Sequence, residues 1–170
     1  MKNKFNKLGF TMMELLVIFI LVAVLAQIAI VTYRRSVEDS NLDRAKVVLE
    51  EVATAVQRLQ TDYPYVMVTH TSAVAKTTGT TGCIINRPSN PSNKVYIANS
   101  TVVTCGYLKN RDWDQQDFSF YLCSNANPGS NGTCCYKGKY LACMKGKASA
   151  GRYADKEYAY EENVGIKGIN

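Results

Sequence analysis

One carboxylate, that of Glu14, lies near the start of a long apolar segment in this 170-residue chain. Between Phe10 and Val31 every side chain is apolar except those of Thr11, Glu14 and Gln27, and about 20 such residues suffice for a helix to cross a membrane. A carboxylate at the edge of such a span is costly unless something neutralises it. Glu14 is therefore a candidate functional residue; the alternative is a carboxylate at headgroup level that does nothing.

The cysteines form a second group of reactive side chains. All of them lie on the carboxyl side of the apolar segment, and an even number of cysteines in an exported domain is typical of disulfides. The sequence has no C-x-x-C pair and its one histidine, His70, is remote from the cysteine cluster, which disfavours a zinc site or a c-type haem. We predict three disulfides among Cys83, Cys105, Cys123, Cys134, Cys135 and Cys143.

Spacing narrows the pairing of these cysteines. Short bracketed loops close at little entropic cost, which favours Cys83 with Cys105 and the remaining bonds within residues 123–143. Cys134 and Cys135 are adjacent, and neighbouring residues of a strand face opposite sides. We therefore expect them to have different partners.

Signatures of catalysis are scarce. His70 has the setting of an ordinary surface histidine, and no Gly-rich phosphate loop, G-x-S-x-G or paired-histidine motif occurs. We expect no enzymatic activity and no cofactor. The carboxylates of Asp112, Asp114 and Asp117 could bind Ca²⁺, but the segment lacks the Gly and the terminal Glu of an EF-hand loop, and a solvated acidic loop is the alternative.

A basic segment at residues 137–152 is interleaved with tyrosines, a composition typical of grooves for single-stranded nucleic acid. Acidic residues follow directly at 155–162, and the two opposite charge blocks suit contacts between copies at least as well. The net charge of +6 falls to about +3 without the three lysines of the first nine residues. This charge does not require DNA as a partner.

Asn99-Ser100-Thr101 and Asn131-Gly132-Thr133 match the glycosylation sequon, a frequent chance match in such loops.

One helix is expected from residue 10 to about residue 62. Beyond the apolar segment, apolar side chains recur at spacings of three and four residues, which places them on one helix face. Tyr63-Pro64 ends the pattern because a residue before proline avoids helical dihedrals. A coiled coil is the alternative, but a helix that covers a sheet fits the short repeat better. The residues of this face are Leu42, Ala45, Leu49, Val52, Val56, Leu59 and Tyr63.

From Pro64 onward, short β-prone runs alternate with turn residues. Alternation places Phe118, Phe120 and Leu122 on one strand face, against the helix. Lys137-Gly138-Lys139 suggests a tight hairpin, and residues 72–93 and 125–133 are expected to be loops. These elements indicate an α+β fold with a long amino-terminal helix and a small sheet. The strand candidates are residues 65–69, 102–108, 118–123, 136–143 and 158–160.

The amino-terminal residues also carry a family resemblance. A leader with three lysines ends at Leu8-Gly9 and is followed by Phe10-Thr11-Met12-Met13-Glu14-Leu15-Leu16-Val17. This pattern resembles the class III signal of type IV pilins and type II secretion pseudopilins, over roughly the first third of the chain. The resemblance implies the pilin fold, in which the long helix packs on an antiparallel sheet. It also implies a disulfide-bounded segment near the carboxyl end, similar to residues 123–143.

The resemblance implies how the chain is processed and assembled. A prepilin peptidase would cut between Gly9 and Phe10 on the cytoplasmic side and methylate the new amino terminus at Phe10. The Glu14 carboxylate would pair with the α-amine of Phe10 of a neighbouring subunit in an apolar filament core. The expected partners are copies of the chain and other pilins, the peptidase, an inner-membrane assembly platform and, before assembly, membrane lipid.

This resemblance divides the chain into three parts. Residues 1–9 are the cleaved leader, residues 10–63 the long helix and residues 64–170 the β domain. Within the helix, residues 10–33 form the membrane span and filament core, and residues 34–63 the amphipathic part. Most relatives carry a proline where this chain has Val31, and many carry a glycine where it has Ala23, so we expect a more continuous helix here.

The competing interpretation of the amino terminus is an ordinary secretory signal cleaved after Val24-Leu25-Ala26. It would release a soluble protein, but it leaves Gly9-Phe10 and Glu14 unexplained. In both cases the lysines before the span favour a cytoplasmic amino terminus. We expect a single-pass inner-membrane protein that later enters an extracellular or periplasmic filament.

The sequence favours a structural function over catalysis. A subunit of a type IV pilus (adhesion, twitching motility or DNA uptake) is the first hypothesis, and a type II secretion pseudopilin, which shares the same amino terminus, is the second. A membrane-tethered extracellular binding domain that never assembles is the third. Glu14 discriminates against the third, since a mere anchor has no need of a carboxylate.

Overall fold

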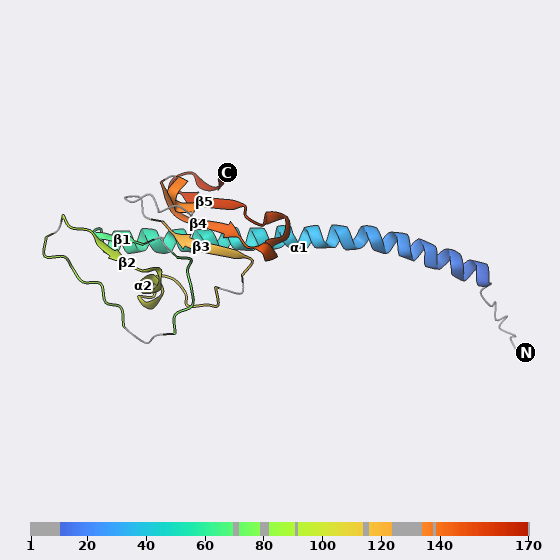
Figure 1. Cartoon of the computed structure of the whole chain (residues 1–170), viewed down its shortest axis with the longest axis horizontal. Coiled ribbons are helices and arrows are strands. Elements are labelled where there is room, and N and C mark those ends of the chain that lie inside the picture. The colour runs from blue at the N-terminus through green and yellow to red at the C-terminus, as the bar shows by residue number, and fades with distance from the viewer. Residues whose placement is uncertain are drawn as a thin grey trace, which may run out of the picture. The chain divides into compact units, whose positions relative to one another are not determined.

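The computed structural model of the chain describes residues 11–69, 72–78, 82–90, 92–113, 116–123, 134–137 and 139–169. By its internal contacts the chain divides into two compact units, residues 1–39 and residues 40–170. One α-helix, α1 (Met12–Asp62), begins in the first unit and continues into the second (Figure 1). The expectation of one helix ending before Pro64 is confirmed.

The continuity of α1 follows from its sequence. The 51 residues of the helix include no proline and no glycine, the two residues that most disfavour a helix interior. Its amino end is capped by Thr11, whose Oγ1 accepts a hydrogen bond from the backbone N–H of Glu14 at 3.3 Å. The helix stops at Asp62, and the N–H of Tyr63 still donates to the carbonyl oxygen of Leu59 at 2.8 Å.

The second unit contains a four-stranded antiparallel sheet in the order β3-β4-β5-β6. A separate pair of short parallel strands, β1 (Val66–Val68) and β2 (Val95–Ile97), follows α1. A short helix, α2 (Asn99–Thr104), and two 3₁₀ helices, η1 (Cys134–Lys137) and η2 (Ala148–Tyr153), connect the strands. The strands of the larger sheet are β3 (Phe118–Leu122), β4 (Tyr140–Gly146), β5 (Glu157–Glu161) and β6 (Gly165–Ile169).

The core of the second unit lies between the later turns of α1 and the sheet. Leu49, Val52, Val56 and Leu59 are fully buried. The inward face of β3 alternates as expected, and its three apolar side chains join the same cluster. Trp113, the only tryptophan, is 2% exposed and meets the ring of Phe120 edge-on, with centroids 5.8 Å apart. The expected helix face and the expected strand face are both confirmed.

Residues 102–108 do not form the expected strand. Residues 99–104 form α2, and the chain then turns, with the N–H of Tyr107 donating to the carbonyl oxygen of Val102 at 3.1 Å. Val102 and Val103 are adjacent and both buried, which a strand with one covered face does not allow. Packing around two consecutive valines outweighs their β propensity.

The strand expected at residues 136–143 begins only at Tyr140 and runs to Gly146. The expected hairpin at Lys137-Gly138-Lys139 is therefore wrong, because η1 and not a strand precedes β4. Two neighbouring disulfides constrain residues 134–137 in this tight helical turn. Sequence reasoning also missed β2 and β6, since β2 has only three residues and β6 contains two glycines.

Candidate functional site

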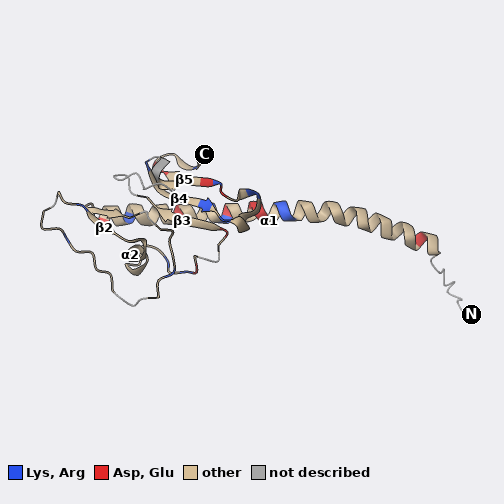
Figure 2. Ribbon diagram, viewed as in Figure 1, with Lys and Arg blue, Asp and Glu red and all other residues tan. Residues whose placement is uncertain are grey.

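The first part of α1 presents its apolar side chains to the surroundings. In its apolar window none of the residues is buried, and the segment is long and apolar enough to cross a membrane. Met12 is 87% exposed and Phe19 is 69% exposed. Figure 2 shows this stretch nearly free of charge, with one acidic turn near its start and a basic turn after it. The membrane-crossing helix expected from the sequence is thus present as a candidate.

One polar side chain directly after this stretch, that of Thr32, is satisfied by the helix itself. Thr32 donates its hydroxyl hydrogen to the carbonyl oxygen of Ile28 at 3.0 Å, a bond that removes the cost of placing a hydroxyl in an apolar medium. Basic residues Arg34 and Arg35 follow within one turn. The side chains from Met12 to Val31 therefore contain a single formal charge, that of Glu14.

Glu14 occupies the third position of the helix, with Thr11 as the N-cap. Thr11-Met12-Met13-Glu14 is a capping-box sequence, in which the N-cap hydroxyl accepts from the backbone N–H of the third residue. That bond is present here at 3.3 Å. A carboxylate in the first turn is also stabilised by the positive end of the helix dipole. Sequence reasoning missed this local role, although the T-x-x-E spacing before an apolar run signals it.

Two site residues expected from the sequence, Gly9 and Phe10, lie outside the described residues. Cleavage between them and the pairing of Glu14 with the Phe10 amine remain predictions. Capping by Thr11 and pairing with an amine are compatible, because the backbone N–H of Glu14 makes the cap bond. The carboxylate remains available to a partner.

All six cysteines are paired. Cys83 bonds Cys105, Cys123 bonds Cys135, and Cys134 bonds Cys143. The expected three disulfides are confirmed, including the first pairing and the confinement of the others to residues 123–143. The first bond ties residues 82–90 to the turn after α2, and the other two fasten η1 to the end of β3 and to β4.

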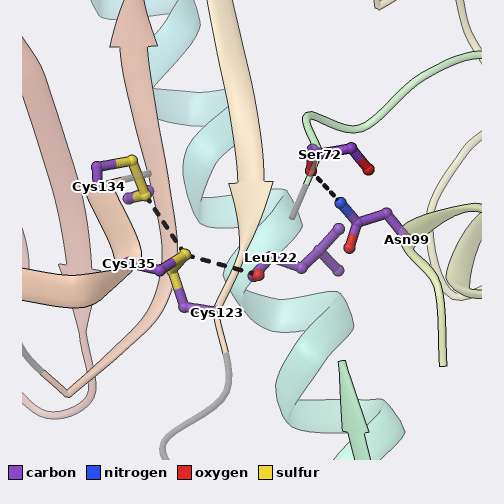
Figure 3. Close-up of a disulfide and its surroundings, with 7 residues drawn as sticks. Ser72, Asn99, Leu122, Cys123, Cys134 and Cys135 are labelled. Carbon is purple, nitrogen blue, oxygen red and sulfur yellow. Dashed lines mark hydrogen bonds between the residues drawn. A yellow bond between two sulfur atoms is a disulfide. The ribbon is translucent and has the colours of Figure 1, made fainter. Parts of the chain in front are cut away.

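Cys134 and Cys135 have different partners, as expected, but for another reason. They lie in η1 rather than in a strand, and successive residues of a 3₁₀ helix point about 120° apart. Figure 3 shows the sulfur of Cys135 beside the carbonyl oxygen of Leu122, 3.6 Å away. It also lies 3.6 Å from the sulfur of Cys143.

The sulfur atoms of Cys123, Cys135 and Cys143 all lie within 4.8 Å of one another and are buried. Such a cluster resembles a set of metal ligands, but metal binding by cysteine requires thiolates. Each of these sulfurs is committed to a disulfide. The packing of these two disulfides in a small buried cluster explains the proximity of the sulfur atoms without a metal.

We predict that thiol labelling of the unreduced, denatured protein will find no free thiol, because every cysteine is bonded. Peptide mapping without reduction should recover the 83–105 pair. It should also recover one linked fragment that holds residues 123, 134, 135 and 143. Two or more reactive thiols per chain in protein from an oxidising compartment would contradict these pairings.

The fold makes the asparagine of the first glycosylation sequon inaccessible. Asn99 is 4% exposed, and its amide nitrogen donates to the carbonyl oxygen of Ser72 (Figure 3). A transferase needs that nitrogen free and accessible, so the folded domain does not offer it. The second sequon, at Asn131, lies outside the described residues.

The structure adds little support for the other candidate sites, which are the acidic loop, His70 and the basic segment. Asp117 accepts a hydrogen bond from Asn41 at 2.9 Å, and Asp112 is exposed, while Asp114 and His70 lie outside the described residues. Calcium binding therefore stays untested. In the basic segment, Tyr140 is 5% exposed, which removes it as a stacking platform for bases.

No family model matches the sequence, and no curated protein or solved structure is detectably similar to the chain.

Proposed function

We propose that the chain is a prepilin and that its mature form is a structural subunit of a type IV pilus-like filament. The observation that carries the proposal is that the two parts of α1 have different surroundings. Its first part exposes an apolar surface with one carboxylate, while its later turns form the core of a disulfide-bonded domain. A helix of this kind can anchor the domain in a membrane and later bind copies of itself.

The exposed apolar surface needs a partner in every state of the protein. About 20 apolar residues in a helix are stable in lipid, so the inner membrane holds the subunit before assembly. In a filament, the same side chains would be covered by those of neighbouring copies, and because lipid tails are as apolar as these side chains, the exchange gains packing contacts rather than a hydrophobic driving force. This exchange of lipid for protein requires no new apolar surface.

The position of Glu14 supports assembly over simple anchoring. Removal of residues 1–9 by a prepilin peptidase would leave an α-amine at Phe10, four residues before the carboxylate. The amine of one copy and the carboxylate of its neighbour would then neutralise each other within the apolar core. An inner-membrane assembly platform would extract the subunit, and the filament would lie in the periplasm or outside the cell.

Two alternatives remain defined. A type II secretion pseudopilin would use the same helix to assemble with copies of itself. A membrane-tethered domain that never assembles is favoured by one observation, the capping bond between Thr11 and the N–H of Glu14, since it gives this segment a role within a single helix. Substitution of Glu14, argued in the Discussion, separates the tethered domain from both filament subunits.

Processing provides the direct test of the proposed function. We expect the mature protein to begin at Phe10 and to have the mass of residues 10–170 plus one methyl group, less two hydrogens for each of the three disulfides. Intact-mass spectrometry of protein extracted from membranes measures this. A mature chain that begins at Gln27 would instead indicate a secreted protein, and an unprocessed chain would indicate a tethered domain.

A further inference from the structure

A groove runs along the second part of α1, between that helix and the turn that follows α2. Two adjoining hollows of about 520 and 680 Å³ form it. They share four lining residues, and the wall opposite α1 is made by residues 105–109. The shared residues are Thr54, Arg58, Gly106 and Tyr107.

The wall opposite α1 is held in place at several points. The Tyr107 hydroxyl donates to the Asp62 carboxylate at 2.5 Å, and this bond raises the pKa of Tyr107 to about 12. Arg111 is ion-paired with Glu51, and Cys105 is bonded to Cys83. The groove is therefore formed before anything binds, which lowers the entropic cost of binding.

Three exposed groups that line this groove suit contact with a partner. Val47 is 67% exposed. Arg58 and Lys109 are exposed, and neither has a carboxylate partner among the described residues. Glu50, also exposed, lines the same hollow and has no cationic partner among the described residues, so the groove combines one apolar contact with two such positive charges and one negative charge.

A complementary surface lies at the turn between β5 and β6. The turn is closed by a backbone hydrogen bond from the N–H of Val164 to the carbonyl oxygen of Glu161 at 3.2 Å. Asn163 has φ 66°, and Glu161 is ion-paired with Lys167. At its tip Val164 is 67% exposed. Glu162 is exposed and, in the described part of the chain, has no cationic partner.

Few large apolar side chains are exposed on the second unit. Among its described residues they are Val47, Ile84, Tyr96 and Val164. One of the four lines the groove together with Arg58 and Lys109, and another lies at the tip of the β5–β6 turn with Glu162. The two sites therefore carry charges of opposite sign that have no ion-pair partner among the described residues. In Figure 1, α2 and β5, the strand that leads into this turn, lie on opposite sides of the later turns of α1. The two surfaces therefore belong to different faces of one domain.

We propose that the groove of one copy receives the β5–β6 turn of a second copy. Val164 would contact Val47, and the Glu162 carboxylate would pair with Lys109 and Arg58. A contact between two different faces is heterologous, and when repeated without closing it generates a helical filament. The inference rests on the proposed function and adds to it a domain contact outside the apolar helices.

Carbodiimide crosslinking tests the contact directly, because it joins a carboxylate to a lysine amine at hydrogen-bonding range. We would co-express one full-length chain with Lys109→Gln and a second with Glu162→Gln. A 162–109 crosslink in this mixture can form only between copies, and mass spectrometry identifies it. Each variant expressed alone is the matched control and should give none. Filaments without this crosslink, or with Lys109 joined to another protein, would overturn the inference.

Charge reversal tests whether the contact matters for assembly. We expect Glu162→Lys or Lys109→Glu to reduce sheared filaments by about tenfold, because like charges then face each other across the contact. The double reversal should return filaments only in part, to within about threefold of wild type, since the 162–109 pair is restored with opposite polarity while Arg58 then faces a positive charge at position 162. Lys76→Glu, at an exposed lysine outside the groove, is the control and should assemble normally. Failure of the double reversal to restore filaments would overturn the inference.

The two proposals fail differently. Wild-type filaments that lack the crosslink would remove the groove contact and leave the proposed function intact. A wild-type chain that never forms filaments would remove the proposed function. A 162–109 crosslink in its membrane fraction would still establish the contact between copies.

Discussion

Replacing Glu14 by leucine should abolish filaments while the mature chain accumulates in the membrane. The substitution makes the segment more apolar, so membrane insertion and cleavage after Gly9 should continue. What is lost is the partner of the Phe10 α-amine of the neighbouring copy. Removing one member of a buried ion pair costs roughly 3–5 kcal/mol, and the cost recurs at every subunit contact. Immunoblots of sheared filaments and of membranes measure both pools.

A matched pair of variants separates the charge of Glu14 from its place in the helix cap. Glu14→Gln keeps a residue that suits the third position of a capping box and removes the charge, so it should fail to assemble as Glu14→Leu does. Thr11→Ala removes the hydroxyl that accepts the Glu14 N–H and keeps the carboxylate. It should weaken the first turn by about 1 kcal/mol and still form filaments.

The outcome assigns the role of the carboxylate. Normal filaments from Glu14→Gln alone would show that the negative charge is dispensable and that the segment needs only a helix cap. Normal filaments from Glu14→Leu alone would show that Glu14 is an interfacial acid. They would then favour a tethered domain or an assembly that depends on other contacts.

The parts of the fold that could be predicted are those with a strong sequence period. In α1, spacings of three and four residues place Leu49, Val52 and Val56 on one face, and all three are fully buried. In β3, alternation correctly places Phe118 and Phe120 inward. Each pattern is local in the sequence, and each apolar face is buried once another element packs against it.

The parts that could not be predicted depend on partners distant in sequence. Residues 102–108 have high β propensity. Residues 99–104 nevertheless form the helix α2, because Val102 and Val103 are buried together. Cys134 and Cys135 form a turn because their partners lie on both sides of it, in β4 and at the end of β3. Neither constraint is visible in the residues themselves.

The candidate site also combines features that could be predicted from the sequence with features that could not. The apolar span and Glu14 are local features of the sequence, and the cap at Thr11 was equally readable from its spacing. The groove beside α1 was not, because Arg58 and Lys109 are 51 positions apart in the printed sequence and meet only after α2 has folded. A charge that is unpaired in the fold looks like any other surface charge in the sequence.

Gly146 at the end of β4 should be irreplaceable for the stability of the domain. A Cβ atom at this position would lie 2.0 Å from the carbonyl oxygen and 2.9 Å from the carbonyl carbon of Tyr153. Both are backbone atoms, so no side-chain rotation relieves the clash. We expect Gly146→Ala to lower the free energy of unfolding by about 3 kcal/mol or more. Denaturant titration in detergent, followed by Trp113 fluorescence, measures this change.

The backbone around Gly146 has little freedom to move away. Its N–H donates to the carbonyl oxygen of Lys156 at 2.9 Å, and its carbonyl oxygen accepts from the N–H of Asp155 at 3.0 Å. The Tyr153 carbonyl oxygen is itself held by the N–H of Lys156 at 3.1 Å. Displacing residue 153 would therefore break the bonds that turn the chain from η2 into β5.

Gly82 provides the control for this prediction. A Cβ atom there meets nothing within 4 Å and its φ is ordinary, so Gly82→Ala should leave stability unchanged or raise it by about 0.4–1 kcal/mol through the unfolded chain. Equal midpoints for Gly146→Ala and wild type would show that residues 146 and 153 do not approach closely in solution. Because β4 also carries Cys143, opening this end of the strand would loosen the disulfide-bonded core as well. A subunit loosened in this way should then reach the filament in lower amounts even though α1 and Glu14 are intact.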